Sequence, residues 1–321
     1  MARRIAVAFN DDAALKKHLN PTELLGELEV VGTAHEVADL LSAELVRVRD
    51  DIKGAINQCR HFDVVVDLCE GVLGQPRFEK SFALALEMFG VPHTSCDPIA
   101  VGLCSNKRLV KDLLIAAGIP TPMRYASHIG VIRGTYIVKP SLEDAGIGIE
   151  PTAVVDTADE LEARCRYVEQ TYRQPALIEQ FIDGRELNQA VLCGRALPAG
   201  EVLFAELLAP RERIVGWKAK WDSGSAEDRA TANRTPAQID DATRAEVVRI
   251  CMAAAQLFGL DMAVRFDLRQ AQTGELYIID INPNPDLGRG TGFRRALDAA
   301  GVSFADCLET LIMAAYARRS P

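Results

Sequence analysis

Short apolar runs alternate with segments of helical spacing through the first third of the chain. Residues 5–9, 30–32 and 63–68 are apolar and rich in β-branched side chains, a pattern that predicts buried strands. Residues 78–89 have helical spacing and stop at Gly90, and glycine commonly follows the last residue of a helix. Because strands that alternate with helices pair in parallel, this order predicts an α/β unit with a Rossmann-like sheet.

Two more strands are predicted in the middle of the chain, at residues 136–139, before Pro140, and at residues 176–182. Residues 221–236 are polar and rich in Ser, Gly, Asp, Arg and Thr, which predicts a mobile loop. The pattern changes near Asp97 and again near Asp183. We therefore expect three structural units.

Residues 106–117 have the spacing of an amphipathic helix. We expect its apolar side to pack against the rest of the protein. That side carries Leu109, Leu113, Leu114 and Ala117. A long helix is also predicted after Asp240 or Asp241, and it ends at Gly259.

Composition narrows the class of protein. The 321 residues are 48% hydrophobic and 25% charged, as in an ordinary globular protein. A formal net charge of −9 argues against a nucleic-acid-binding protein, and no apolar run has the roughly 20 residues that span a bilayer. The eight cysteines form no CxxC pair, which favours free thiols in the cytoplasm.

Several common site motifs are absent from the sequence. It contains neither GxGxxG nor GxxxxGK[ST], so a nicotinamide cofactor and a P-loop nucleotide site have no support. The histidines lack the HxxH and HExxH spacings typical of zinc sites. A catalytic cysteine–histidine pair stays open as an alternative.

The most informative segment consists of two strand-like runs on either side of a Thr-Gly pair at 273–274. If these two residues form the loop of a hairpin, Asp267 lies opposite Asp280 and Arg265 lies opposite Asn282. Alternation then places all four side chains on one face of the sheet. Directly opposed Cβ atoms lie about 4.5–5.5 Å apart. Two carboxylates at that separation repel each other and require a cation.

Two explanations account for these paired carboxylates. In the first, Arg265 neutralises both in a structural salt-bridge cluster. In the second, they bind a metal ion, and ligands that are all oxygen atoms favour Mg²⁺ or Mn²⁺ over zinc. The spacing alone leaves both explanations open.

Seven short segments give this hairpin a wider context, because they occur in a recognisable order. They are Ser105-Asn106-Lys107, Val138-Lys139-Pro140-Ser141, Ile178-Glu179-Gln180-Phe181, Gly184-Arg185-Glu186, Ala219-Lys220, Val264-Arg265-Phe266-Asp267 and Ile279-Asp280-Ile281-Asn282-Pro283. Together they resemble the ATP-grasp superfamily and, within it, the D-alanine–D-alanine ligase family, over nearly the whole chain. The resemblance implies a Rossmann-like N-terminal domain at 1–96, a central ATP-grasp subdomain at 97–182 and a C-terminal ATP-grasp subdomain at 183–321. The last two are α+β units that hold ATP between them.

The resemblance assigns nucleotide contacts to individual residues. Lys107 and Lys139 match lysines that contact the α- and β-phosphates, and Glu186 matches the acid that binds the ribose hydroxyls. The adenine edge is read by the backbone of a hinge strand that matches Glu179, Gln180, Phe181 and Ile182. Ordinary structural explanations exist beside these roles: an exposed first-turn lysine for Lys107 and a solvated turn for Glu186.

The resemblance also implies a metal centre and a reaction. Asp267, Asp280 and Asn282 match residues that hold two magnesium ions, and manganese is possible. Arg265 would stabilise the transferred phosphoryl group, and Lys220 would assist from the mobile loop. Phosphorylation of a carboxylate would give an acylphosphate that an amine then attacks, so the expected enzyme is an ATP-dependent carboxylate–amine ligase that forms an amide bond.

The substrate side departs from the family pattern. Asp286 stands where a glycine is expected, and Glu70 lies in a segment that replaces an Asn…His-Gly signature. Arg289, Arg294 and Arg295 could hold a substrate carboxylate, although the last two could also form an ordinary basic helix turn. We take Asp286, Arg289 and Glu70 as candidate substrate contacts.

We therefore expect small amino-acid-like substrates and a product other than D-alanyl-D-alanine. The alternatives are a peptide or protein acceptor, a ring-closing synthetase, and a nucleotide-binding protein without catalysis. Neither nucleic acid nor a membrane is expected as a partner, and a homodimer is expected by analogy.

Overall fold

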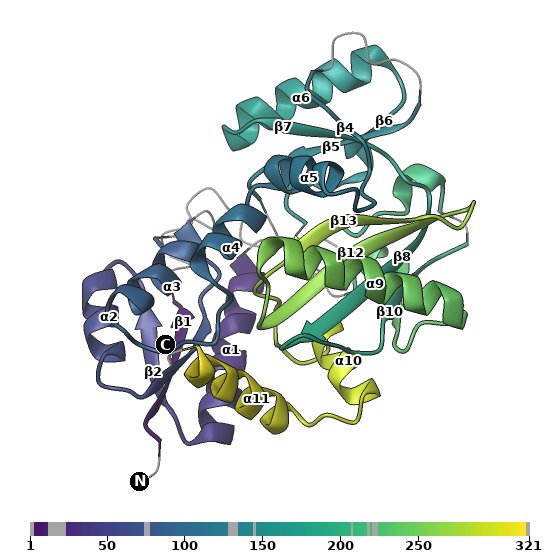
Figure 1. Cartoon of the computed structure of the whole chain (residues 1–321). Coiled ribbons are helices and arrows are strands. Elements are labelled where there is room, and N and C mark those ends of the chain that lie inside the picture. Colours follow the sequence, from purple (N-terminus) through teal and green to yellow (C-terminus); the bar gives the residue numbers. More distant parts are fainter. Residues whose placement is uncertain are drawn as a thin grey trace.

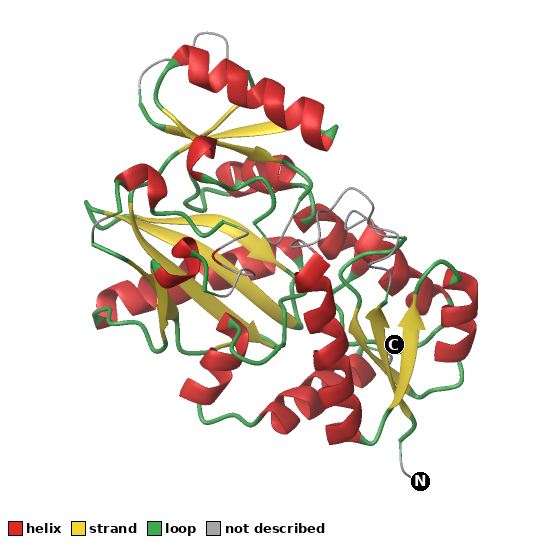
Figure 2. Ribbon diagram, turned by 180° about the vertical axis from the view of Figure 1, so that it is seen from behind, coloured by secondary structure: helices red, strands yellow, loops and turns green. Residues whose placement is uncertain are grey.

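The computed structural model describes residues 3–11, 24–73, 78–127, 134–143, 146–206, 208–216, 219 and 224–318, with the side chains of 24–28 left out. It contains three β-sheets, each covered by helices (Figures 1 and 2). In Figure 1 the four-stranded sheet lies at the top, the six-stranded sheet in the middle and the three-stranded sheet at the lower left.

The first sheet has the strand order β2-β1-β3, and its strands β1 (Ile5–Asn10), β2 (Glu44–Val48) and β3 (Val64–Leu68) are parallel. The predicted parallel sheet is therefore confirmed. The helices of this unit are α1 (Leu24–Leu41), α2 (Ile52–Cys59), α3 (Glu79–Met88) and α4 (Pro98–Cys104).

The predicted strand at residues 30–32 is wrong, because these residues lie within α1. Val30 and Val31 are partly buried there and pack against the hydrophobic core. Three apolar residues in a row are compatible with either period, so a run this short does not distinguish a helix from a strand.

Helix α5 (Lys107–Ala116) begins where it was predicted, with Asn106 accepting a hydrogen bond from the Leu109 amide as its N-cap. Its buried side agrees with the predicted one only in part: Leu114 is buried and Leu113 packs half-buried against the core, whereas Leu109 is 37% exposed. The buried residues are Lys107, Val110, Lys111 and Leu114. Two lysines on the buried side of a helix indicate a polar site beneath it.

The four-stranded sheet has the order β4-β7-β5-β6. Its strands are β4 (Arg124–Tyr125), β5 (Tyr136–Pro140), β6 (Val154–Val155) and β7 (Ala176–Gln180). A 3-10 turn (Pro151–Ala153) leads into β6, and α6 (Ala158–Tyr172), capped by Thr157 and Glu160, covers one face. Val138 and Ile178 face α6 in this core. Alternation directs the neighbouring Lys139 and Glu179 to the other face.

The six-stranded sheet is antiparallel and has the order β11-β10-β8-β12-β13, with β9 paired to β8. Its strands are β8 (Gly184–Leu192), β9 (Arg195–Ala196), β10 (Gly200–Phe204), β11 (Thr231–Arg234), β12 (Ala263–Ala271) and β13 (Leu276–Asn282). Helix α9 (Asp241–Phe258) crosses one face, and α10 (Gly292–Ala299) and α11 (Phe304–Ala317) follow β13. A 3-10 turn (Pro210–Glu212) and α8 (Ala226–Arg229) lie between β10 and β11.

The predicted mobile loop at 221–236 is wrong for its described part, because residues 224–236 include α8 and β11. Strand β11 forms the edge of the sheet, and its side chains are half-buried or exposed. An edge strand with solvated side chains is polar in composition, which explains why its sequence resembles a loop.

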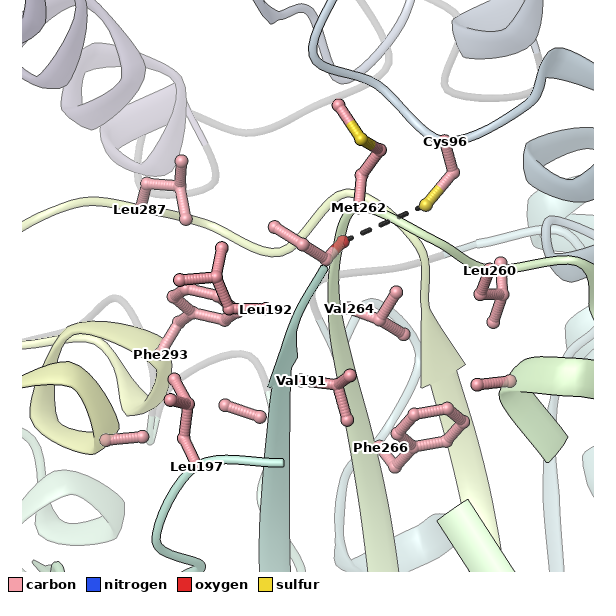
Figure 3. Packing of buried hydrophobic residues seen from close by; sticks show 14 of the residues in the cluster. Cys96, Val191, Leu192, Leu197, Leu260, Met262, Val264, Phe266, Leu287 and Phe293 are labelled. Atoms are coloured by element: carbon pink, nitrogen blue, oxygen red, sulfur yellow. Dashed lines mark hydrogen bonds between the residues drawn. The ribbon is translucent and has the colours of Figure 1, made fainter. Parts of the chain in front are cut away.

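One hydrophobic cluster joins the first sheet to the six-stranded sheet, since it contains Phe9 of β1, Ala34 of α1 and Leu308 of α11. Figure 3 shows its part around β8 and β12, where Val191, Val264 and Phe266 pack near Phe293 of α10. Alternate residues of β12 therefore face the core, and the residues between them face away from it.

Helices α4 and α5 both follow the predicted domain limit near residue 97. Residues of both helices belong to the cluster that joins the first and six-stranded sheets, although α5 also contacts β4. The three sheets lie within residues 1–96, 97–182 and 183–321, and these limits stay a prediction. Among the described residues, no single helix is long and apolar enough to cross a membrane, while the bent pair α10 and α11 passes that test only when taken together.

Candidate active site

A cleft of about 580 Å³ is lined by residues from all three parts of the chain. Helix α6 covers one face of the four-stranded sheet and α9 covers one face of the six-stranded sheet. The opposite face of each sheet lines the cleft. Every predicted site residue except Lys220 lines this cleft, and Lys220 lies outside the described residues. The sequence prediction therefore selected residues that the fold brings together, while their individual roles stay predictions.

The carboxylate hairpin has the predicted pairing. In the register of β12 and β13, Asp267 lies opposite Asp280 and Arg265 lies opposite Asn282. The predicted loop is wrong, however. Gly274 donates its amide hydrogen to Ala271, and the residues beyond the turn pair one position out of the predicted register, with Gln270 opposite Leu276.

A β-bulge in β13 restores the register near the site. The pairing shifts between Asp267 and Leu268, where Ile278 lies opposite Leu268 and Ile279 is the additional residue. The loop and the bulge thus offset each other, and Asp267 still faces Asp280. Bulges redirect side chains next to active sites.

Each carboxylate of the hairpin has its own basic partner. The Arg265 guanidinium donates to both oxygens of Asp267, with Nε–Oδ1 at 2.9 Å and Nη2–Oδ2 at 3.1 Å. Asn188 on the neighbouring β8 also donates to Asp267, at 2.9 Å. Lys107 Nζ lies 2.8 and 3.0 Å from the two oxygens of Asp280. The salt-bridge explanation required Arg265 to neutralise both carboxylates, but in the structure Lys107 pairs with Asp280.

Nearby cations also set the protonation of Asp280. Burial alone would raise the pKa of Asp280, but Lys107 and Lys139 outweigh it and hold that pKa below its ordinary range. The negative charge of Asp267 raises the pKa of Arg265. Asp280 is thus ionised near neutral pH, which is the form that binds a metal ion.

The residues at the hairpin fit a hard divalent cation. Asp267, Asp280 and the Asn282 amide present oxygen donors from one sheet face. Asn282 Oδ1 accepts a hydrogen bond from the Asn284 amide at 2.9 Å, which fixes its orientation. Within the described ranges, no group of three or more His, Cys, Asp or Glu side chains is placed to hold a metal ion. Two carboxylates and one amide fit a metal that shares its remaining ligands with phosphate groups.

A buried network of two lysines surrounds Glu179. Its carboxylate lies 2.9 Å from Lys111 Nζ and 2.7 Å from Lys139 Nζ, and all three side chains are at most 8% exposed. Lys111 also donates to Thr121 Oγ1 at 2.8 Å and to the carbonyls of Ile278 and Ile279 at 2.9 and 3.1 Å. Burial lowers the pKa of Lys111 to about 8, although Glu179 opposes this shift.

Among the described residues, Lys111 is the one side chain that contacts both carbonyls of the bulge in β13, while Thr121 donates to the Ile278 carbonyl at 2.7 Å and Lys139 to the Ile279 carbonyl at 3.4 Å. In a regular strand, successive carbonyls point in opposite directions, whereas here two successive carbonyls reach the same ammonium group. The bulge makes this possible, and the ammonium group compensates the two carbonyls. Lys111 therefore connects Glu179 to the segment that sets the position of Asp280.

The predicted adenine hinge begins at Glu179 and ends at Ile182. Two of its backbone amides are already occupied: Gln180 donates to the Met123 carbonyl and Phe181 to the Thr135 carbonyl, each at 2.9 Å. An adenine edge would have to be read by other backbone groups of residues 179–182. The predicted ribose acid, Glu186, lies further along the cleft and forms a 2.8 Å ion pair with Arg269.

The three residues predicted as substrate contacts all line the cleft. Asp286 Oδ1 accepts a hydrogen bond from the Gly288 amide at 2.7 Å, and burial raises the pKa of this carboxyl group. Arg289 is 80% exposed and pairs with Glu36 at 3.1 Å. Glu70 is exposed, and its amide donates to Asn10 Oδ1 at 2.7 Å.

The two arginines of α10 differ in environment. Arg294 pairs with Glu36 at 3.1 Å and lies over the Phe304 ring, so it has the structural role that a basic helix turn predicts. Arg295 lines the cleft beside Arg265, and no ion pair joins it to any described carboxylate. Burial and the neighbouring Arg265 lower the pKa of Arg295. Two guanidinium groups side by side in a cleft attract an anionic ligand.

Comparison with known proteins identifies the family. The family model described as "D-ala D-ala ligase C-terminus" matches residues 131–313, which is more than half of the chain. The protein belongs to the D-alanine–D-alanine ligase family. It is an ATP-dependent carboxylate–amine ligase of this type, and enzymes of the family use ATP together with a divalent metal ion.

Individual relatives agree with this assignment. "Uncharacterized protein y4sG" of Sinorhizobium fredii is 29% identical over 79% of this chain and 75% of its own length. The D-alanine–D-alanine ligase of Gluconobacter oxydans is 26% identical over 80% of this chain and 82% of its own length. The crystal structure of the D-alanine–D-alanine ligase of Bacillus anthracis complexed with ATP covers 99% of both chains with a TM-score of 0.75 at 19% identity, which shows a shared ATP-grasp fold.

Three residues of this ligase that line the cleft or support it were missed from the sequence. They are Lys111, Asn188 and Arg269. Asn188 and Arg269 carried a usable signal, since each lies two residues from a predicted site residue on the same strand and therefore on the same face. Lys111 carried a weaker one, as it follows Lys107 by one helical turn.

Proposed function

We propose that this ligase joins a small amino-acid-type carboxylate to the amine of an amino acid, and that its product is not D-alanyl-D-alanine. The observation that supports it most is the contrast within one cleft. Its nucleotide end carries the expected basic and acidic residues, while its substrate end carries Asp286 and an arginine, Arg295, with no ion pair to a described carboxylate.

At the nucleotide end, Lys107 and Lys139 would contact the α- and β-phosphates. Asp267, Asp280 and Asn282 would hold two magnesium ions, or manganese in their place, which supply positive charge to the β- and γ-phosphates. In the structure, both lysines are paired with acidic side chains of the cleft, so nucleotide binding requires them to exchange partners. Arg265 would stabilise the transferred phosphoryl group, with Lys220 in support.

The proposed reaction has two steps. A carboxylate oxygen of the first substrate attacks the γ-phosphorus of ATP, the bond to the β-phosphate oxygen breaks, and ADP leaves. The amine nitrogen of the second substrate then attacks the acyl carbon of the acylphosphate and loses a proton. The acyl C–O bond breaks, inorganic phosphate leaves, and an amide remains.

The geometry around Gly292 supports an acceptor with a free carboxylate. A Cβ atom at this position would lie 3.8 Å from Arg265 Cδ, 3.9 Å from Arg295 Nη2 and 4.0 Å from Asn188 Oδ1. Gly292 is also the first residue of α10, whose N-terminal amides favour anions. A carboxylate there would be bound by Arg295 and would leave Arg265 to the phosphoryl group.

The side chain of Asp286 argues against the expected family product. A carboxylate next to a developing oxyanion is unfavourable, and no described basic side chain pairs with Asp286. A cationic group on the substrate would remove this conflict. We therefore propose substrates with a positive charge besides the reacting groups, and Glu70 and Arg289 as further contacts at the rim.

The test is ATP-dependent phosphate release with single amino acids and with pairs, with products identified by mass. We expect turnover with pairs that include a basic amino acid, and vigorous turnover with D-alanine alone would refute the proposal. Asp280→Ala and Lys139→Ala should each abolish ATP consumption; if neither does, the assigned site is wrong. Arg295→Met should raise the KM of the acceptor, with Arg294→Met as the matched control on the same helix.

The mass of the product also separates the alternatives. Modification of a peptide or protein would increase the mass of a macromolecule, and a ring-closing reaction would consume one substrate with loss of water. We further propose small-molecule partners, a homodimer and a cytoplasmic location. All eight cysteines are free thiols, and seven of them are buried, which supports a reducing compartment.

A further inference from the structure

Arg269 lies at the nucleotide end of the cleft, on β12 and two residues beyond Asp267. In the register of the sheet it stands directly opposite Glu186 on β8. Their side chains form a 2.8 Å ion pair and are 5% and 8% exposed. Glu186 is the residue proposed to bind the ribose hydroxyls, so its charge partner bears directly on nucleotide recognition.

The Arg269 guanidinium group has further partners. It donates to the carbonyl of Gly184 at 3.2 Å and to the carbonyl of Arg213. It also lies 5.9 Å from the centre of the Phe181 ring and 5.2 Å from that of Phe204. One side chain thus contacts the hinge, the ribose acid and the segment that follows β10.

The segment 208–216 borders the cleft through Ile214 and Val215. Its last described residue, Gly216, lies so close to the four-stranded unit that a Cβ atom there would be 2.2 Å from the Ile149 carbonyl oxygen. Four residues further along the chain is Lys220. Arg269 therefore contacts the described segment that precedes a proposed catalytic lysine in the chain.

We propose that Arg269 is a positioning residue for the nucleotide, which orients the Glu186 carboxylate toward the ribose hydroxyls and anchors the segment 208–216. This inference rests on the proposed function, because the ribose role of Glu186 belongs to it. The planar guanidinium group donates several hydrogen bonds in a fixed arrangement, which fixes the plane of a carboxylate better than an ammonium group does. A carboxylate held in this way presents its free lone pairs in a defined direction.

The test compares the affinity for ATP with that for 2′-deoxy-ATP and 3′-deoxy-ATP, measured by calorimetry with Mg²⁺ present. A charged hydrogen bond to a hydroxyl group favours ATP by about tenfold or more. We expect Arg269→Met to reduce this preference severalfold, because Glu186 loses its orientation. Arg269→Lys should give an intermediate preference, since one ammonium group does not reach both Glu186 and the Arg213 carbonyl.

A matched control is available in the same sheet. Arg185 pairs with Glu201 at 2.7 Å but does not line the cleft, so Arg185→Met removes another arginine–glutamate pair of this sheet and should leave the preference for ATP unchanged. A purely structural role for Arg269 would lower stability or overall affinity in its variants without changing the ratio between ATP and the deoxynucleotides.

Glu186→Gln distinguishes the proposed ribose role of Glu186 from the proposed positioning role of Arg269. If this variant keeps the full preference for ATP, Glu186 does not bind the ribose and that part of the proposed function fails. If Glu186→Gln loses the preference while Arg269→Met and Arg269→Lys keep it, only the positioning role of Arg269 is overturned. Should Arg269→Met not fold, the lysine variant alone decides: an intermediate ratio supports the role, and the wild-type ratio refutes it.

Discussion

Replacement of Lys111 by methionine tests the connection between the buried network and the metal hairpin. Methionine fills most of the apolar volume of the lysine stem but lacks the ammonium group. The variant therefore loses four polar contacts at once: Glu179 Oε1, Thr121 Oγ1 and the carbonyls of Ile278 and Ile279, all within 3.1 Å of Nζ.

The structure indicates the size of the effect on stability. Removal of one partner of a buried ion pair costs about 3–5 kcal/mol, because the other charge stays buried. Glu179 keeps Lys139 at 2.7 Å from its second oxygen, so we expect a loss near the lower end, about 3 kcal/mol in the free energy of unfolding.

A separate effect on function is expected, because the bulge at Ile279 loses the ammonium group that contacts both carbonyls. Thr121 at 2.7 Å from the Ile278 carbonyl and Lys139 at 3.4 Å from the Ile279 carbonyl remain, so the position of Asp280 opposite Asp267 is weakened. The affinity for a non-hydrolysable ATP analogue in the presence of Mg²⁺ should fall by about tenfold or more, which corresponds to about 1.4 kcal/mol.

Urea unfolding and calorimetric titration measure the two effects. Lys53→Met on the exposed side of α2 serves as the control, and a change within about 0.5 kcal/mol is expected for such a surface position. A loss of less than 1 kcal/mol together with unchanged Mg²⁺-dependent affinity in Lys111→Met would show that the network neither stabilises the fold nor positions the hairpin.

Two further predictions concern titration and metal binding. His93 is 3% exposed, and its burial, followed by the charge of Arg318, lowers its pKa from 6.5 to about 4. The folded state therefore favours the neutral imidazole. The protein loses stability as the pH falls from 6.5 toward 4, by about 3 kcal/mol in total. By urea unfolding, the stability advantage of the wild type over His93→Gln should shrink by about 2 kcal/mol between neutral pH and about pH 5, and an unchanged advantage refutes this assignment. Lys107→Met should increase the affinity for Mn²⁺ without nucleotide by about tenfold, because Asp280 loses its competing cation, while the affinity for ATP falls; equal Mn²⁺ affinity of variant and wild type would contradict the pairing.

Much of the fold could be predicted because strand and helix boundaries carry local signals. The N-cap Asn106, the terminal Gly259 and the buried strand at 64–68 are examples in which side-chain chemistry or burial determines the structure locally. The strand predicted at residues 30–32 and the loop at 221–236 failed because their structure depends on distant partners. Helix α1 forms against β1, and β11 forms because β10 offers an edge.

The candidate site illustrates a different limit. The pairing of Asp267 with Asp280 was predicted from a two-residue loop, but the actual loop is longer and a bulge offsets the difference. A bulge depends on what its carbonyls contact, and here the contacts are Lys111, Thr121 and Lys139, all far away in sequence. The predicted register was therefore correct although the turn on which it rested was wrong.

The network also explains why its central lysine escaped notice. A lysine on an amphipathic helix normally faces solvent, and the buried side predicted from the apolar positions of α5 did not include Lys111. The burial of Lys111 only follows once Glu179 and the bulge are known to lie beneath α5. Residues that recognise a ligand leave a pattern along the strands that carry them, whereas a residue that positions them is identified by contacts between segments. Lys111 and Arg269 are both positioning residues. Each connects a proposed nucleotide contact to a part of the chain that is distant from it in sequence.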